Sequence, residues 1–293
     1  MFYRRKILLA ILQEFGKPEK IAFQKLLFLF TLKQETPSYD FIPFHYGGYS
    51  ISANADLWAM SQKGMVEQAE TCYRKGDKKD YSKMLKPADQ TALDQIKRDF
   101  YDYSSDELMR FTYVNFGYYA INSKTAQRLL TQAELAEIEK VRPRNEKSVL
   151  YTIGYEGISL EEYLNRLIKN DVRLLVDVRS NPVSMKFGFS KKQLQTYCAS
   201  VNIAYTHLPE VGIRSEYRQG LNSQQDYDIL FGAYKNTTLA QTKGTQQEIL
   251  RLVETNQRIA LTCFEADIGK CHRTHLAKAV TELPEWKFAL AHL

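Results

Sequence analysis

The second half of the sequence predicts an α/β domain with a mainly parallel sheet and flanking helices, and the first half predicts a mostly helical α+β domain. Two observations support this prediction. After residue 148, short apolar runs of strand length alternate with helical patterns, as is typical of parallel sheets. Residues 141–148 (VRPRNEKS) form a polar, proline-containing stretch between the two patterns. We therefore expect one domain over residues 1–145 and another over 148–293.

The first domain combines three helical patterns with a predicted hairpin. Apolar residues recur on one helix face over residues 7–15, and Gly16 and Pro18 end that helix. We predict helices over residues 7–15, 21–30 and 51–64, then strands at 65–67 and 72–84 around a turn at 75–78, and further helices within 88–140. Three helices followed by a hairpin are the element order of a winged helix, so we expect a winged-helix-like domain.

The second domain alternates strands and helices along its whole length. We predict strands at residues 148–153, 173–178, 203–208, 258–263 and 286–290, and helices at 160–168, 191–200, 227–234, 246–255 and 272–280. In sheets of this kind ligands bind outside the carboxyl ends of the strands. The residues that follow each strand are therefore the candidates for a site.

Composition limits the class of protein. The chain has 293 residues, 44% of them hydrophobic and 25% charged, and a net charge of only +6, which leaves a nucleic-acid partner open without favouring it. The basic and apolar start resembles a signal peptide, but Gln13 and Glu14 interrupt the apolar run. No stretch reaches the length of a membrane span, and four cysteines in a chain of this length do not suggest a disulfide framework. We expect a cytoplasmic, reduced protein without a membrane partner.

Polar side chains follow four of the predicted strands. The candidates for ligand binding at these strand ends are Tyr155, Glu156, Arg179, Glu210 and Cys263, and those for catalysis are His207 and Glu265. Because carboxyl ends of parallel strands meet at one edge, we expect these side chains to share one rim. Asp177 precedes Arg179 with one residue between them, and we expect it to point to the opposite face or to cap a loop.

Cys271, His272 and Arg273 stand at a predicted helix start. A helix N-terminus and nearby arginines favour an anion, so Cys271 is expected to have a depressed pKa and to serve as a nucleophile or redox thiolate. Arg179 and Arg273 would hold a phosphorylated or nucleotide-like ligand. His207 would act as general acid or base, oriented by Glu265 or Glu210. The alternative is a buried free cysteine beside a structural arginine.

A metal site and a closing loop are two further interpretations of the same region. Cys263, Cys271, His272 and His207 include metal-ligand types, but seven residues separate the cysteines, unlike the close pairs of most zinc sites. This spacing permits a metal without indicating one, so we predict no cofactor and leave a divalent metal open as the less favoured interpretation. The charged residues Arg214, Glu216 and Arg218 could close over the rim, although a solvated loop is favoured.

The predicted hairpin of the first domain is basic. Lys75, Lys78 and Lys79 could neutralise phosphates of a nucleic acid, or the hairpin could dock a protein partner. Charged hairpins also occur simply as solvated edges. Two functions therefore remain open. One is a cysteine-dependent transferase or hydrolase acting on an anionic ligand, and the other is a ligand-sensing regulator whose first domain binds DNA or a protein.

Four motifs, YTIGYEG, LLVDVRSNP, YTHLPEVG and CFEADIGKCHR, resemble those of the bacterial family known as domain of unknown function 488. The resemblance covers residues 148–293 and implies an α/β fold without implying a particular reaction; Val211 stands where leucine is usual. The VDVR strand end also looks loosely like that of rhodanese, but Leu276 stands where an arginine would close a rhodanese-type loop. The first domain is similar to a region fused ahead of this family in longer members, and faintly to antitoxin-type domains, with Phe23 in place of a leucine.

Overall fold

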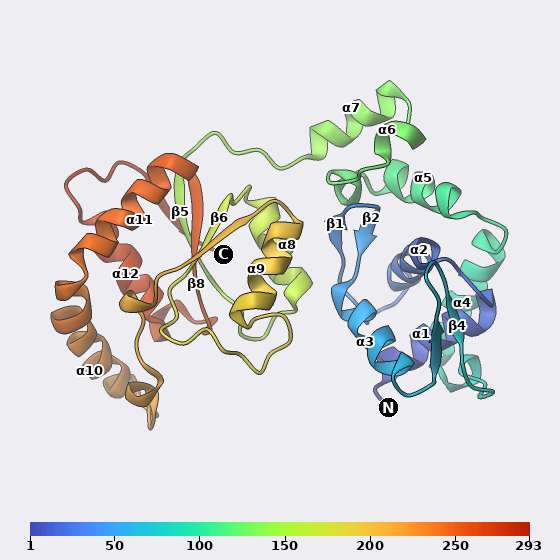
Figure 1. The fold of residues 1–293 in the computed structure, drawn as a ribbon, viewed down its shortest axis with the longest axis horizontal. Coiled ribbons are helices and arrows are strands. Elements are labelled where there is room, and N and C mark those ends of the chain that lie inside the picture. The colour runs from blue at the N-terminus through green and yellow to red at the C-terminus, as the bar shows by residue number, and fades with distance from the viewer. The chain divides into compact units, whose positions relative to one another are not determined.

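The computed structural model covers residues 1–293 and divides the chain into two compact units, Met1–Arg142 and Pro143–Leu293 (Figure 1). No helix in either unit has the length and apolar character needed to traverse a lipid bilayer.

The first unit is mostly helical. Its helices are α1 (Tyr3–Phe15), α2 (Lys20–Thr31), α3 (Ile51–Ser61), α4 (Pro87–Phe100), α5 (Ser105–Asn115), α6 (Ala126–Leu129) and α7 (Gln132–Val141), and its strands are β1 (Ile42–Phe44), β2 (Gly47–Tyr49), β3 (Val66–Gln68) and β4 (Tyr73–Lys75). Apolar residues of α1 and α2 form the centre of its core. The helices α1, α2 and α3 confirm the first three predicted helices. The Ser50 side chain caps α3 by accepting from the Ala53 amide.

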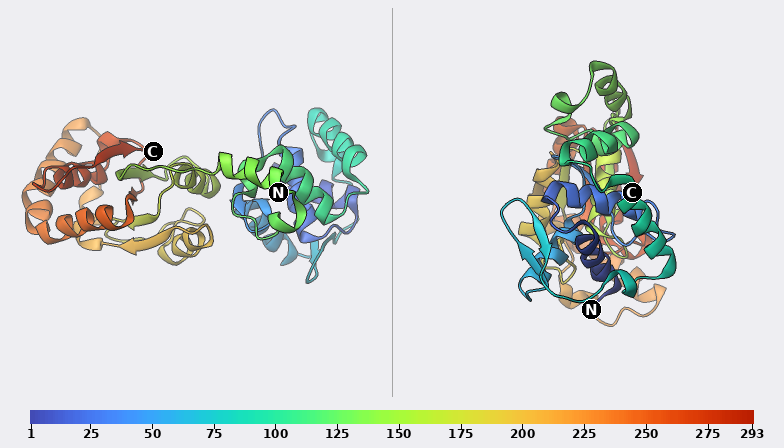
Figure 2. Two further views of the ribbon diagram at one scale, coloured as in Figure 1. Left: turned by 90° about the horizontal axis from the view of Figure 1, so that it is seen from above. Right: turned by 90° about the vertical axis from the view of Figure 1, so that its right-hand side faces the viewer.

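The hairpin β3–β4 differs from the predicted one in the position of its turn. Gln68 pairs with Tyr73, so the chain reverses at residues 69–72 and not at 75–78. The segment after β4 is no strand, because Lys75 closes a separate turn by donating from Nζ to the carbonyls of Asp77 and Lys79. Gln13 of α1 then accepts from the Tyr81 amide and anchors the returning chain. The hairpin, drawn in cyan, extends from the helices in Figure 2.

The second unit is an α/β domain built on a five-stranded parallel sheet in the order β7-β6-β8-β5-β9, which confirms the predicted fold class. Its elements are β5 (Val149–Gly154), α8 (Leu160–Lys169), β6 (Leu174–Asp177), α9 (Lys191–Ser200), β7 (Ala204–His207), α10 (Gln224–Tyr234), α11 (Lys243–Asn256), β8 (Arg258–Cys263), α12 (His272–Thr281) and β9 (Ala289–His292). Helices α8 and α9 cover one face of the sheet, and α10, α11 and α12 lie on the other (Figure 1).

The strand register places the four site-bearing strand ends side by side. Gly154 of β5 pairs with Cys263 of β8, and Asp177 of β6 pairs with both Thr262 and His207. Strands β5, β6 and β8 are buried along their whole length, in agreement with their continuous apolar runs. The last strand, β9, begins three residues later than predicted.

Candidate functional site

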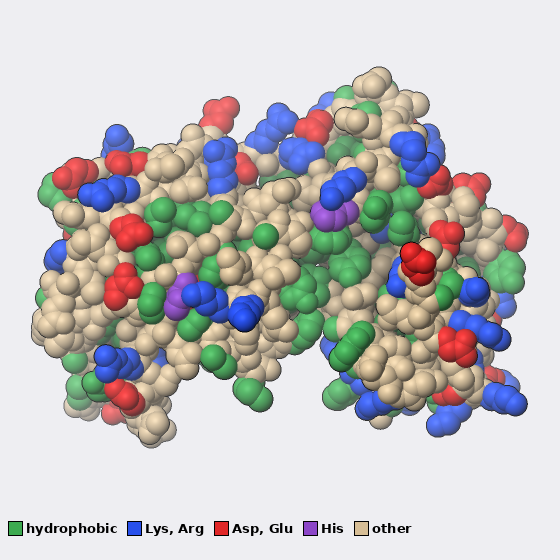
Figure 3. All heavy atoms as spheres, in the orientation of Figure 1, with side chains coloured by type: hydrophobic (Ala, Val, Ile, Leu, Met, Phe, Trp, Pro, Cys, Tyr) green, Lys and Arg blue, Asp and Glu red, His purple; other side chains and the backbone are tan.

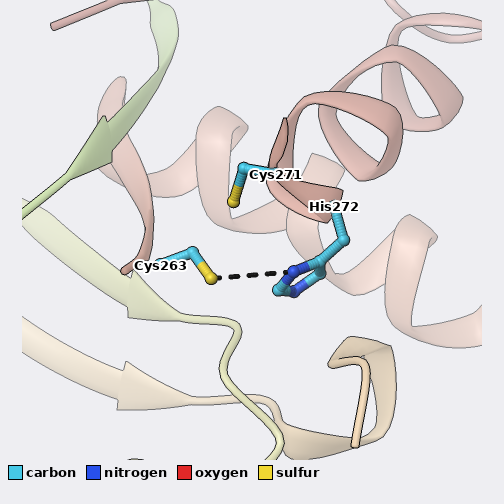
Figure 4. A group of neighbouring side chains, drawn as sticks. All are labelled: Cys263, Cys271 and His272. Atoms are coloured by element: carbon cyan, nitrogen blue, oxygen red, sulfur yellow. Dashed lines mark hydrogen bonds between the residues drawn. The ribbon is translucent and has the colours of Figure 1, made fainter. Parts of the chain in front are cut away.

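Cys263, Cys271 and His272 form a buried cluster at the carboxyl edge of the sheet (Figure 4). Cys263 ends β8, whereas Cys271 and His272 stand at the start of α12. The two sulfur atoms and one ring nitrogen of His272 all lie within 4.8 Å of one another. Within this cluster, Cys263 Sγ lies 3.6 Å from His272 Nδ1.

The His272 ring is oriented by a backbone carbonyl. Its Nε2 lies 2.9 Å from the Val178 carbonyl oxygen, so this nitrogen carries the proton and donates. The lone pair of Nδ1 consequently faces Cys263 and accepts from Arg218 Nη2, at 2.6 Å. The imidazole is thus held in the tautomer that presents an acceptor to the cluster.

Arg218 and Glu265 complete the polar surroundings of the cluster. Arg218 Nη1 donates to Glu265 Oε1, and the Cys263 thiol donates to Glu265 Oε2 over 3.2 Å. Burial by itself would raise the pKa of Glu265, but the charge of Arg218 together with hydrogen bonds from the two cysteines and a backbone amide outweighs that effect and holds the pKa below its ordinary value. Arg218 belongs to the charged loop that the sequence predicts to be solvent-exposed. Arg214 and Glu216 of that loop are indeed exposed, whereas the Arg218 side chain is 23% exposed.

Cys271 does not have the depressed pKa that the sequence predicted. The residue is fully buried, and this burial raises the pKa of its thiol well above the ordinary value, with the hydrogen bond to Cys263 adding to the effect. The expectation of a ready thiolate at Cys271 is therefore wrong for this arrangement of groups.

Arg179 is engaged in a buried ion pair. Its Nε and Nη2 donate to the two oxygens of Asp177, at 2.8 and 2.5 Å, and Nη1 donates to the Tyr155 hydroxyl and the Phe189 carbonyl. Asp177 also accepts from the Tyr205 hydroxyl. The prediction that Asp177 points away from Arg179 is wrong, because residues two apart in an extended chain share a face. Arg179 thus has its donors satisfied within the protein.

Arg273 supports the loop between the two cysteines. Its Nη1 and Nη2 donate to the carbonyl oxygens of Glu265 and Ala266, and its side chain is buried. Glu156, from the end of β5, accepts from the Ala266 amide at 3.0 Å and holds the same loop from the other side. Gly154 permits this close approach, since a Cβ there would collide with the Glu265 carbonyl.

His207 and Glu210 lie apart from the sulfur cluster in their contacts. His207 Nε2 lies 2.8 Å from the Arg179 carbonyl oxygen, and its Nδ1 lies 3.1 Å from Lys191 Nζ. Glu210 accepts from the Thr245 hydroxyl at 3.0 Å. Neither residue hydrogen-bonds a member of the cluster. Contrary to the expectation from the sequence, the structure therefore does not bring His207 into contact with Cys271.

A cavity of about 1240 Å³ adjoins the cluster. Tyr234 forms part of its wall and also packs edge-on against the His272 ring, with 5.7 Å between the ring centres. Tyr217 and Gln219 line the cavity on either side of Arg218 in the sequence. Other polar residues of the wall are Ser180, Glu210, Arg214, Asp226, Thr237, Thr238, Gln241 and Thr242. Tyr234 therefore links the wall of the cavity to the sulfur cluster, whereas Arg218 and the cluster residues themselves do not line the cavity.

The basic residues of the first domain differ in how free they are. Lys75 is tied to the carbonyls of its own turn and lies 3.5 Å from Asp77, while Lys78 and Lys79 are exposed. On the face drawn in Figure 3, basic side chains are interspersed with acidic ones. Two of the three lysines singled out in the sequence are thus exposed, and the third is held within its own turn.

The family model described as domain of unknown function DUF488 matches residues 159–280. This match confirms the resemblance drawn from the four sequence motifs and lies wholly within the second domain. No curated protein and no solved structure matches the chain. The winged-helix-like character of the first domain stays a prediction.

Proposed function

We propose that the second domain takes up a small anionic ligand, phosphorylated or nucleotide-like, in the cavity of about 1240 Å³ and processes it beside the sulfur cluster. The observation that carries this proposal is the position of Arg218. It is the cationic side chain that touches the cluster, and its sequence neighbours Tyr217 and Gln219 line the cavity.

The contacts of Arg218 suit an anion holder. Its buried Nε lacks a hydrogen-bond acceptor, an energetic cost that a ligand oxygen would remove. Arg179, which the sequence suggested for this role, is committed to Asp177. Arg273 has a buried Nε without an acceptor as well, but its other donors are committed to backbone carbonyls and it does not hydrogen-bond the cluster. His272 supplies the neighbouring acceptor at Nδ1, and Cys263 a thiol within reach of it. A cysteine-dependent transferase or hydrolase is the enzyme class that these groups suit best.

Ligand binding by the full chain tests this proposal. A panel of phosphate, phosphorylated sugars and nucleotides is screened by thermal shift, and any hit is measured by calorimetry. Arg218→Gln should weaken binding by about 10- to 150-fold, since a hydrogen bond to a charged group contributes about 1.5–3 kcal/mol. Arg251→Gln, a change at an exposed arginine of α11, is the matched control. Equal binding by the Arg218 variant, or no hit at millimolar concentration, would overturn the proposal.

The second candidate function is a ligand-sensing regulator whose first domain binds DNA. The observation that favours it is the state of Asp56 on α3, which as a free negative charge would repel a polyanion. Asp56 is buried and ion-paired with Arg4 and Arg5, at 2.7 Å each, so α3 does not present that charge. Lys78 and Lys79 are exposed beyond the neighbouring hairpin.

Gel retardation at low salt separates DNA binding from docking of a protein. Lys78→Ala/Lys79→Ala should weaken DNA binding and reduce its dependence on log salt by about 2 if both lysines contact phosphates. Lys192→Ala/Lys287→Ala, two exposed positions in the second domain, lowers the net charge equally and serves as the control. Retardation that both double variants weaken to the same extent would mean that total charge, and not the hairpin, causes it.

A further inference from the structure

We infer that Cys263, Cys271 and His272 form a binding site for a divalent transition-metal ion of the zinc type, with a fourth coordination position open toward the ligand cavity. The inference goes beyond the proposed function, because a cysteine that binds an ion serves as a ligand and not as the nucleophile of a cysteine-dependent enzyme, and it rests on that function only for the use of the open position. The three-residue cluster itself is independent of any anionic ligand.

The distances fit tetrahedral coordination. Zinc–sulfur bonds of about 2.3 Å and zinc–nitrogen bonds of about 2.0–2.1 Å put a sulfur and a nitrogen ligand about 3.6 Å apart in a tetrahedron. Cys263 Sγ and His272 Nδ1 are separated by 3.6 Å. All three donor atoms lie within 4.8 Å of one another, so a contraction of about 1 Å or less at Cys271 would complete the set.

The histidine is prepared for the role of a ligand. Histidines that bind metals almost always donate their other ring N–H to a carboxylate, a carbonyl or water, which fixes the ring and the tautomer. In His272, Nε2 donates to the Val178 carbonyl at 2.9 Å, and Nδ1, which accepts from Arg218, lies 3.6 Å from the sulfur of Cys263. His275, on the next turn of α12, instead packs against Phe231 and lies outside the cluster.

The loop between the cysteines accounts for their unusual spacing. Seven residues separate Cys263 from Cys271, but Arg273 and Glu156 clamp the loop at Glu265 and Ala266. Farther along the loop, the Asp267 side chain accepts from the Gly269 amide. These contacts bring the strand end and the helix start together without the close C-x2-C pairing, and they hold the two sulfurs in place before an ion arrives.

Arg218 shows that the acceptors of the cluster face a positive charge. Its guanidinium donates to His272 Nδ1 and to Glu265, and its sequence neighbours Tyr217 and Gln219 line the cavity. An ion bound to Nδ1 displaces the guanidinium from that nitrogen, while the ion pair with Glu265 keeps Arg218 nearby. Three protein ligands and one open position are the arrangement of catalytic zinc sites, and the open position beside Arg218 would accept one oxygen of an anionic ligand.

The donor set also selects the class of ion. Two thiolates and an imidazole are soft ligands that suit Zn²⁺ and its analogue Co²⁺, whereas Mg²⁺ and Ca²⁺ prefer oxygen donors. Cobalt is therefore the probe for this site, because tetrahedral thiolate coordination gives it visible absorption bands that zinc lacks.

The test is a cobalt titration of the reduced full-length chain after treatment with a chelator and dialysis. We expect one Co²⁺ per chain with the visible bands of tetrahedral thiolate coordination, displaced by Zn²⁺. Separate Cys263→Ser, Cys271→Ser and His272→Asn variants should each lose these bands, with affinity reduced by at least about 100-fold. The matched controls Cys198→Ala and His275→Asn should keep them, since neither residue belongs to the cluster.

Other outcomes are equally decisive. Absence of the bands in the wild-type chain, or bands that survive all three ligand substitutions, would overturn the site. X-ray absorption of the zinc-loaded wild-type chain, which needs no variant to fold, should report two sulfur ligands, and none or one would also overturn it. Loss of the bands in Glu265→Gln would refute the open position by making Glu265 a ligand. Cobalt binding without Arg218-dependent ligand binding would leave the metal site standing and remove the proposed function.

Discussion

Removing the negative charge of Asp177 tests whether Arg179 is structural or holds a ligand. The Asp177 side chain is completely buried and that of Arg179 is 6% exposed, and the carboxylate accepts from two guanidinium nitrogens and from Tyr205. Asp177→Asn keeps the shape of the side chain but leaves a guanidinium in the protein interior without a counter-charge.

The cost follows from the burial of the pair. Removing one partner of a buried ion pair destabilises by about 3–5 kcal/mol, because the remaining charge stays out of water. This is a large part of the roughly 5–15 kcal/mol that stabilises a typical domain. Replacing both partners by apolar groups, as in Asp177→Leu/Arg179→Met, should recover part of this loss, since no buried charge then remains.

Urea unfolding measures this effect in the second domain. The chain has two tryptophans, Trp58 and Trp286, so a Trp58→Phe background makes fluorescence report on the second domain alone. Glu162→Gln, which breaks an exposed i,i+4 pair with Arg166, is the control and should cost no more than about 1 kcal/mol. A loss below about 1 kcal/mol for Asp177→Asn would refute the structural role. If anion binding became tighter as well, because Arg179 is released from its counter-charge, the role of anion holder first predicted for Arg179 would be restored.

Three further changes are expected to have measurable effects on stability. Burial lowers the pKa of Lys25 from 10.5 to about 7, so between these pH values the unfolded chain binds a proton that the folded chain lacks. The stability of the wild-type chain should therefore rise with pH from about 7 toward 10.5. Lys25→Met should lack this rise when both proteins are unfolded in urea at about pH 7 and about pH 9. Gly154→Ala should cost about 1–3 kcal/mol and weaken cobalt binding, because the added methyl meets the Glu265 carbonyl and shifts the loop between the cysteines. Gly244→Ala, at an open position of α11, should instead stabilise by about 0.5–1 kcal/mol in the same urea assay, and destabilisation there would contradict the helix assignment.

The elements of the second domain could be predicted because their signals are local. Strand β8 spans Arg258–Cys263 and helix α9 spans Lys191–Ser200, the ranges that the apolar pattern and the flanking polar residues predicted. A strand covered on both faces needs a continuous apolar run, and that run can be recognised without knowledge of the neighbouring strands.

The hairpin of the first domain could not be predicted in the same way. Its turn lies at residues 69–72, a segment without the glycine that drew attention to Gly76. The actual path depends on Gln13 of α1 accepting from the amide of Tyr81, a contact between residues 68 positions apart. No local pattern encodes such a contact.

In the site, too, the sequence predicted which residue types are present but not which partners they have. The sequence placed polar side chains at the correct strand ends, since the carboxyl edge of a parallel sheet follows from its topology. It could not show which arginine has free donors, because that depends on the partners each one finds. Asp177 neutralises Arg179, two carbonyls occupy Arg273, and Arg218 reaches the cluster from a loop whose charged neighbours are exposed. Arg218 is itself ion-paired with Glu265, but of the three arginines it is the one that hydrogen-bonds a member of the cluster. The position of the charge, and not its presence, therefore decides the candidate ligand holder, and only the folded arrangement reveals it.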